Sequence, residues 1–188
     1  MASEELDDAI ELGDARVRLR PWRSDDAAAL VEAVRESIET VGRWLPWCHA
    51  GYGIEEAATW IAHCRSGWQA GDHFALAIFD ATSGRLLGGA GLSQLVAVHR
   101  HANLGYWIRQ SGQRQGAATD AAQLVARFGF ERLGLLRIEI VVLPENRASR
   151  ATAEKIGARF ESIARHRLLL PDGARDAAVY GLIAQDLG

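Results

Sequence analysis

The sequence predicts one mixed α+β domain whose elements follow one another as β-α-α-β-β-β-α-β-α-β-β. Apolar residues recur at helical spacing in some segments and in short or alternating runs in others, which indicates both kinds of element. Two turn sequences, Thr82-Ser83-Gly84 and Pro171-Asp172-Gly173, each separate two strand-like runs, as in β-hairpins. The chain has 188 residues, of which 48% are hydrophobic, and this suits a single domain with a sizeable core.

Seven strands are expected. The first begins at Val17, where Val17 and Leu19 alternate with Arg18 and Arg20, and it ends at Pro21. The others are short apolar runs bounded by turn residues or, in the last hairpin, runs that flank a turn. They are expected over 74–79, 86–95, 102–109, 136–143, 160–170 and 176–183.

The helices begin and end at recognisable residues. Ser24 is expected to cap a helix over 25–37, because its hydroxyl can accept a hydrogen bond from a free backbone N–H. A second, short helical piece is expected near 38–43. A longer helix over 54–70 stops at Gly71. Two further helices are expected over 116–133 and 147–156.

Charge excludes several classes of function. Twenty of the 21 basic residues are Arg, and the single Lys155 follows Glu154, so the phosphate loop of P-loop NTPases is excluded. Residues 1–14 carry six acidic and no basic residues, unlike a signal peptide, and are expected to form an acidic extension before a domain over 15–188. No run of about 20 apolar residues suggests a membrane span, so we expect a cytoplasmic protein without membrane or nucleic-acid partners.

Two adjacent pairs, Cys48-His49 and His63-Cys64, raise the alternative of a zinc site. Structural zinc sites usually separate paired ligands by two to four residues, whereas these are neighbours in the chain. We therefore expect no metal and two reduced thiols.

The segment 106–120 reads as a strand, a polar loop and the start of a helix. Unpaired backbone N–H groups at a helix start can bind an anion, and a glycine such as Gly116 lets a phosphate approach the backbone. The alternative is that Gly116 only serves a tight turn between strand and helix.

This loop, Gln113-Arg114-Gln115-Gly116-Ala117-Ala118, resembles the Q/R-x-x-G-x-G/A pyrophosphate loop of the GNAT acetyltransferases. Six further stretches resemble the RimJ/RimL-type branch, which comprises ribosomal-protein N-terminal acetyltransferases, and they occur in the order found in that branch. They are Leu19-Arg20-Pro21 followed by Asp25-Asp26-Ala27, Leu104-Gly105-Tyr106-Trp107-Ile108, Ala118-Thr119-Asp120-Ala121, Pro144-Glu145-Asn146-Arg147-Ala148-Ser149, Lys155-Ile156-Gly157-Ala158, and the segment 173–180.

The resemblance implies a twisted, mostly antiparallel sheet with a splay between the fourth and fifth predicted strands, and acetyl-CoA as co-substrate. Backbone groups of Trp107 and Ile108 would bind the pantetheine arm in the splay, together with Asn146. Ser149 would protonate the departing thiolate. The pyrophosphate would be bound by Gln113, Arg114, Gln115, Gly116, Ala117, Ala118 and Thr119.

One position departs from the family pattern. Relatives often carry a Glu that activates the acceptor amine where this chain has Asn103, and an amide cannot accept a proton at useful pH. His101 shares the strand face of Asn103 and is a candidate base, the alternative being an exposed histidine in a polar turn. Glu36 and Glu39 are weaker candidates.

Trp44, Trp47 and Tyr106 are expected to contact the acceptor, although such aromatic residues also serve as core anchors. At pH 7.5 an α-amine is roughly one third neutral, whereas a lysine side chain is ~0.1% neutral. A site without a strong base therefore suits an α-amine.

The sequence accordingly predicts an N-acetyltransferase that acts by direct attack on a protein or peptide α-amine, as a monomer or homodimer. Two alternatives remain open: an acetyltransferase for small-molecule amines, and a non-catalytic acyl-CoA-binding protein.

Overall fold

The computed structural model describes residues 10–187 and joins its strands in one eight-stranded sheet of order β1-β2-β3-β4-β5-β6-β8-β7. Every neighbouring pair is antiparallel except β5 and β6. The mixed α+β fold is thereby confirmed, with the two-residue strand β1 added to the seven expected. The strands are β1 (Leu12–Gly13), β2 (Val17–Pro21), β3 (Phe74–Asp80), β4 (Leu86–Val96), β5 (His101–Ile108), β6 (Arg137–Val142), β7 (Arg159–Leu170) and β8 (Gly173–Leu182).

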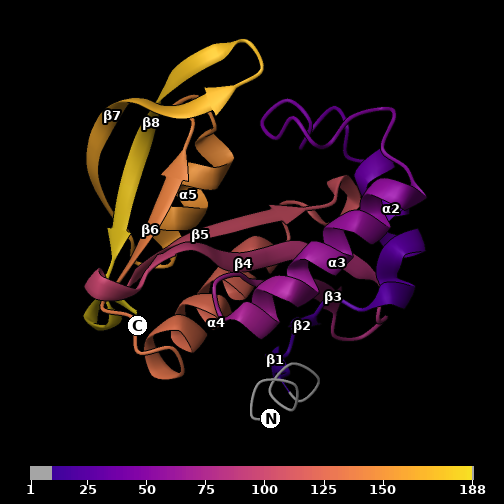
Figure 1. The fold of residues 1–188 in the computed structure, drawn as a ribbon, viewed down its shortest axis with the longest axis horizontal. Helices are drawn as coiled ribbons and strands as arrows, with labels where there is room; N and C mark the ends of the chain where they lie inside the picture. Colours follow the sequence, from indigo (N-terminus) through magenta and orange to yellow (C-terminus); the bar gives the residue numbers. More distant parts are fainter. Residues whose placement is uncertain (1–9, 188) are drawn as a thin grey trace.

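Helices cover both faces of the sheet (Figure 1). Alternation along β3 sends Ala75 and Ala77 toward α2 and α3, and Leu76 and Ile78 toward α4. Each face therefore has its own hydrophobic core, and the sheet separates them. The helices are α2 (Ala27–Arg35), α3 (Ile54–Ala70), α4 (Ala117–Glu131) and α5 (Arg147–Lys155).

The sheet opens between β5 and β6. Their parallel pairing covers only three residue pairs, from His101 with Arg137 to Asn103 with Glu139. Beyond Asn103 the two strands diverge, and Figure 1 shows β6, β7 and β8 turning away from the rest of the sheet. The expected splay between the fourth and fifth predicted strands is confirmed, and it leaves the backbone of β5 free to pair with something else.

Two local expectations were wrong. Residues 38–43 form hydrogen-bonded turns, because the carbonyl of Ser37 accepts the N–H groups of Thr40, Val41 and Gly42 and no regular i to i+4 ladder develops. Ser24 does not cap a helix, since it begins a short 3₁₀ turn in which Asp26 accepts the N–H of Arg23 at 2.8 Å.

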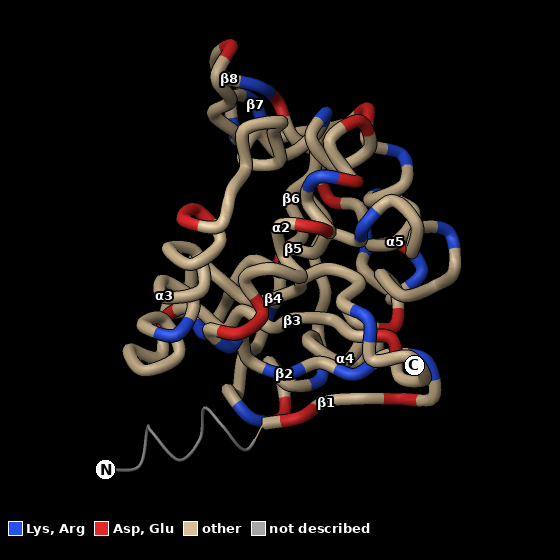
Figure 2. Tube along the Cα trace, turned by 90° about the vertical axis from the view of Figure 1, so that its right-hand side faces the viewer, with Lys and Arg blue, Asp and Glu red and all other residues tan. Residues whose placement is uncertain are grey.

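Residues 1–9 of the predicted acidic extension lie outside the described part of the chain, whereas Leu12–Gly13 pair with β2. Figure 2 shows acidic and basic residues interspersed along the chain. Among residues 10–187, no helix is long and apolar enough to cross a membrane.

Candidate active site

A cavity of about 1820 Å³ occupies the region of the splay. Its wall includes the far end of β5, the start of α4, the start of α5, part of α3 and the turns between α2 and α3. Most of the predicted site residues line it. They are Trp44, Trp47, Asn103, Tyr106, Trp107, Ile108, Gln113, Arg114, Gly116, Ala117, Ala118, Thr119, Asn146 and Ser149.

Residues 114–118, which we call the amide loop, comprise the end of the connection from β5 and the first two residues of α4. Arg114 and Gly116 both adopt positive φ, at 61° and 89°. Because of this winding, the five N–H groups of the amide loop make no hydrogen bond to another residue within 10–187. Unpaired N–H groups at the positive end of a helix dipole form an anion site.

Gly116 is favoured by its positive φ, and its small size also leaves room for the side chain of Arg16. A Cβ atom at this position would collide with the guanidinium of Arg16. That guanidinium donates to the carbonyl of Gln115 at 2.9 Å and pairs with Asp120 at 3.2 Å. Arg16 therefore supports the amide loop from outside. The side chain of Gln115 donates to the Ser111 carbonyl, and this residue is not among those that line the cavity. Its predicted contact with the pyrophosphate, through its backbone N–H, stays a prediction.

The turn before the amide loop is held by α2. The Glu36 carboxylate accepts from the N–H and hydroxyl of Ser111, at 2.9 and 2.7 Å, and from Arg109 at 2.5 Å. Hydrogen bonding to Arg109, which is 1% exposed, lowers the pKa of Glu36 to about 2. Glu36 is therefore a structural carboxylate and a poor candidate for a base.

Tyr106 and Ser149 meet across the splay. The Tyr106 hydroxyl donates to the Ser149 carbonyl at 2.9 Å, and the Ser149 hydroxyl donates to the Tyr106 oxygen at 3.3 Å. Asn146 caps α5 by accepting the N–H of Ser149 at 3.2 Å. Burial raises the pKa of Tyr106 to about 12, which keeps this hydroxyl protonated. Tyr106 thus lies with Ser149, on the sheet face opposite Trp107.

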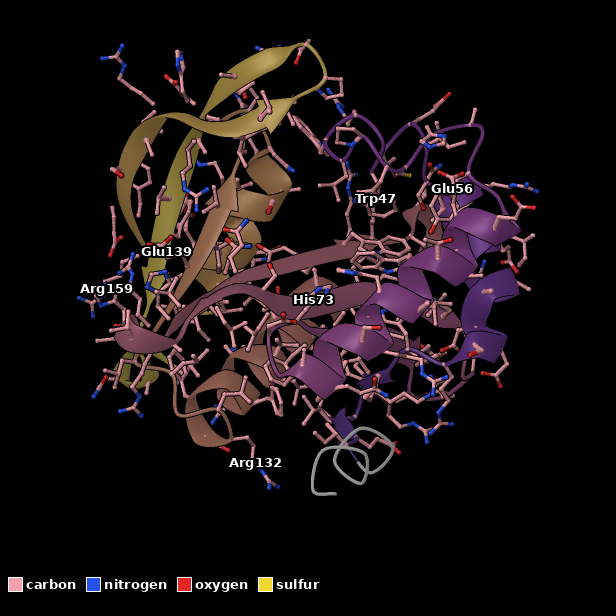
Figure 3. The ribbon with its side chains drawn as sticks, viewed as in Figure 1. Trp47, Glu56, His73, Arg132, Glu139 and Arg159 are labelled. Carbon is pink, nitrogen blue, oxygen red and sulfur yellow. The ribbon has the colours of Figure 1, made fainter. Side chains whose placement is uncertain are left out.

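The other face carries the aromatic wall. Trp47 packs edge-on against Trp107, with ring centroids 5.3 Å apart, and Trp44 lies under the guanidinium of Arg43. Trp47 remains 39% exposed, so its ring is available to a ligand. Trp44 and Trp47 both line the cavity, and Figure 3 shows Trp47 on its α3 side.

Asn103 lies at the point where β5 and β6 separate. Its Oδ1 atom is buried and has no hydrogen-bond partner in the described chain. The register pairs Asn103 with Ser93 on β4, and both line the cavity. His101, two residues earlier, stacks on His99 and is not among the lining residues.

Sequence reasoning missed His73, which also lines the cavity beside Trp60 and His63. It lies just before β3, and the only available signal was that a polar residue starts an apolar strand. Its place near Asn103 depends on strand pairing across 30 positions of sequence.

A family model described as an acetyltransferase (GNAT) domain matches residues 16–159. The chain is a GNAT acetyltransferase. Among its relatives, YdaF of Bacillus subtilis is assigned as a ribosomal N-acetyltransferase. YdaF is 28% identical over 172 residues, covering 90% of this chain and 92% of YdaF.

Solved structures resemble this GNAT acetyltransferase over almost its whole length. A Vibrio cholerae protein assigned as a ribosomal-protein-serine acetyltransferase is 32% identical, with a TM-score of 0.84, and the match covers 94% of this chain and 98% of the other. RimJ of Mycobacterium smegmatis, solved with CoA-disulfide, is 28% identical with a TM-score of 0.83, covering 95% and 89%.

The cysteines of the acetyltransferase, Cys48 and Cys64, are both buried as free thiols. Over residues 10–187, no group of three or more His, Cys, Asp and Glu residues could hold a metal ion. The Sγ atom of Cys48 instead donates to the carbonyl of Val34 at 3.6 Å.

Proposed function

We propose that this acetyltransferase transfers an acetyl group from acetyl-CoA to the α-amine of a protein or peptide. The observation that carries the proposal is the amide loop at the start of α4, which has five unpaired N–H groups and four residues that line the cavity, namely Arg114, Gly116, Ala117 and Ala118. A pyrophosphate offers oxygens for these donors, and the CoA bound to RimJ, a related protein, contains one.

The remainder of the co-substrate fits the splay. The pantetheine arm carries amide groups that can pair with a strand, and β5 has unpaired backbone beyond Asn103. The arm would lie against Trp107 and Ile108 and end between the aromatic wall and Ser149. The thioester would therefore lie between the two faces, with the acceptor on the side of α3.

In this proposal Ser149 protonates the leaving thiolate. Its hydroxyl contacts the Tyr106 hydroxyl, which is held protonated by its burial. A proton given by Ser149 can be replaced through Tyr106, so the two hydroxyls form a short relay.

Two findings favour an α-amine as acceptor. YdaF is assigned as a ribosomal N-acetyltransferase, and the Vibrio cholerae protein as a ribosomal-protein-serine acetyltransferase. The last residue of β5 that pairs with β6 is Asn103, whose amide side chain cannot act as a base. An α-amine is already partly neutral at pH 7.5, so it needs less help from a base than a lysine side chain does.

A thiol-release assay with a pool of hexapeptides bearing free N-termini tests this function. The same pool with acetylated N-termini is the matched control, and spermidine and aminoglycosides represent small amines. We expect thiol release with the free peptides and none with the blocked pool. Turnover on small amines alone would contradict the proposed acceptor. Acetyl-CoA binding without turnover on any amine would identify a non-catalytic binding protein.

A further inference from the structure

Three polar side chains form a row across neighbouring strands on the α3 face of the sheet. Ser93 pairs directly with Asn103, and Phe74 pairs with Leu92. His73, one residue before Phe74, therefore lies opposite Ser93. Neighbouring strands are about 4.8 Å apart, so the Cα atoms of His73 and Asn103 are separated by about 10 Å. All three residues of the row line the cavity.

Both ends of this row carry a buried polar atom without a hydrogen-bond partner among the described residues. The Nδ1 atom of His73 and the Oδ1 atom of Asn103 are buried and make no hydrogen bond to any residue from 10 to 187. Buried polar atoms nearly always have a partner, so two such atoms in one cavity need an explanation. A protonated amine, or a water molecule bound beside it, would supply the missing donors.

The packing around His73 keeps its imidazole neutral. Its backbone and Cβ lie against Gly67 of α3, where a larger residue would collide with it, and its ring lies 5.6 Å from Trp60 and 5.1 Å from His63. Burial, followed by the proximity of His63, lowers the pKa of His73, and Asp72 opposes this effect. On β4 and β5 it is faced by Ser93 and Asn103, which do not titrate. A neutral imidazole at pH 7 can accept a proton.

Other titratable groups along the cavity are less suitable. Glu55 and Glu56 lie in the first turn of α3, about 12 Å along the helix axis from His63. Glu56 also lies 3.2 Å from the Nε2 atom of His49. The register also pairs Asn103 with Glu139 on β6, but this carboxylate is paired with Arg137 at 3.1 Å and does not line the cavity. His73 is therefore the titratable group of the row that lines the cavity.

We propose that His73 is the base for acetyl transfer and takes the proton of the acceptor amine through a water molecule held between Ser93 and Asn103. The inference rests on the proposed function. The ammonium group loses one proton through this water to His73, and the nitrogen lone pair then forms the C–N bond to the acetyl carbon. The C–S bond breaks, and the thiolate takes a proton from Ser149. The nitrogen loses its second proton to water as the amide forms, and a proton from water returns to Ser149 through Tyr106. His73 releases its proton to solvent, so one proton is produced for each amide.

The test compares His73→Ala, His73→Gln, Asn103→Glu and the double variant His73→Ala with Asn103→Glu. His73→Gln keeps a polar side chain of similar size that cannot titrate, which guards against a loss caused by folding. His99→Ala, at an exposed position, is the matched control. Thiol release is measured with the free-N-terminus hexapeptide pool at pH 6.5 and 8.5, and thermal melting checks that each variant is folded.

At pH 6.5 an α-amine is ~5% neutral, so removal of the base should matter most there. We expect both His73 variants to lose at least about tenfold in kcat/KM at pH 6.5 and less than about threefold at pH 8.5, with the affinity for acetyl-CoA unchanged. A carboxylate at position 103 can take over the role of the base, so the kcat/KM of the double variant at pH 6.5 should lie within about threefold of that of Asn103→Glu alone.

Wild-type rates in His73→Gln at pH 6.5 would overturn the proposal, as would an equal loss at both pH values without rescue by Asn103→Glu. If the wild-type protein binds acetyl-CoA but acetylates no peptide, the proposed function itself fails. That outcome differs from an active enzyme that is indifferent to His73.

Discussion

At the scale of single residues, the contact between Ser149 and Tyr106 joins β5 to α5 exactly where the sheet opens. The two hydroxyls are 3.3 Å apart, and Tyr106 also donates to the Ser149 carbonyl. The cap of α5 uses Asn146 and the Ser149 N–H, not the Ser149 hydroxyl. The hydroxyl of Ser149 can therefore be removed without removing the helix cap.

We expect Ser149→Ala to lower kcat by about 100-fold while the Kd for acetyl-CoA stays within about threefold, because the hydroxyl acts only as the thiolate leaves. Steady-state thiol release and calorimetry measure the two quantities. Tyr106→Phe should give a smaller loss, since Ser149 keeps its own proton. Ser66→Ala, an exposed change on α3, serves as the control, and an unchanged kcat in Ser149→Ala would remove this residue from the mechanism.

Site residues could be predicted from the sequence where they belong to a local motif. They could not be predicted where strand pairing brings distant residues together. Gly116 and Ser149 stand in local patterns of six residues, so the sequence alone indicated them. His73 meets Asn103 only through the register of β3, β4 and β5. Strand alternation turns Tyr106 toward Ser149 and puts Trp107 on the opposite face of the sheet, which the sequence alone did not indicate. Because Tyr106 also lines the cavity, its predicted contact with the acceptor stays a prediction.

At the scale of elements, α2 and the turn that precedes α4 behave as one unit. At the end of α2, Glu36 accepts a hydrogen bond from Ser111, and Ser37 accepts one from Gln110. Arg109 donates to the carbonyl of Leu86 on β4 and to the carboxylate of Glu32 on α2, so it links that strand to the helix. The position of the amide loop therefore depends on a helix 70 residues earlier in the chain.

This unit predicts a pH dependence of stability. The pKa of Glu36 falls to about 2 in the folded protein, so its contribution is fully present above its ordinary pKa of 4.5 and is lost as the pH falls toward 2. We expect Glu36→Gln to lower the unfolding free energy at pH 7 by about 2 kcal/mol, and Tm by roughly 4–8 °C.

The difference between wild type and Glu36→Gln should shrink as the pH is lowered from 4.5, measured by thermal melting. Glu39→Gln, at an exposed position three residues later, is the control and should change Tm by less than about 1 °C. A difference that is the same at pH 7 and pH 3 would show that the charge of Glu36 is not the cause.

Element boundaries were predictable where sequence punctuation was strong. Gly71 ends α3 with a φ of 73°, a left-handed angle that glycine adopts freely, and its position was read from the sequence. The helical piece near 38–43 was wrong, because a local pattern does not reveal that one carbonyl of Ser37 collects three N–H groups.

At the scale of the whole molecule, the sheet is nearly divided. Strands β1–β5 and strands β6–β8 are connected within the sheet by the pairing of β5 with β6, which covers three residue pairs. The order of strands along the chain followed from periodicity, whereas the splay came from the family resemblance, since hydrophobic patterning does not record where two strands part.

A ligand that fills the splay should therefore stabilise the fold as a whole. At 100 times its Kd, acetyl-CoA should add about 2.7 kcal/mol and raise Tm by roughly 5–11 °C. Scanning fluorimetry measures the shift. Acetylpantetheine, which lacks the pyrophosphate, is the matched control and should give a much smaller shift at the same concentration. Equal shifts from both compounds would show that the amide loop is not the phosphate site.

Lys155 is the one lysine of the sequence, and it is exposed at the end of α5 where it lines the cavity. An amine-reactive dye would therefore modify a single side chain, besides the chain's own N-terminus, and that side chain lies beside the place expected for the co-substrate. The fluorescence of such a conjugate would report the entry of each ligand directly, so the composition of this protein supplies a built-in position for an optical probe.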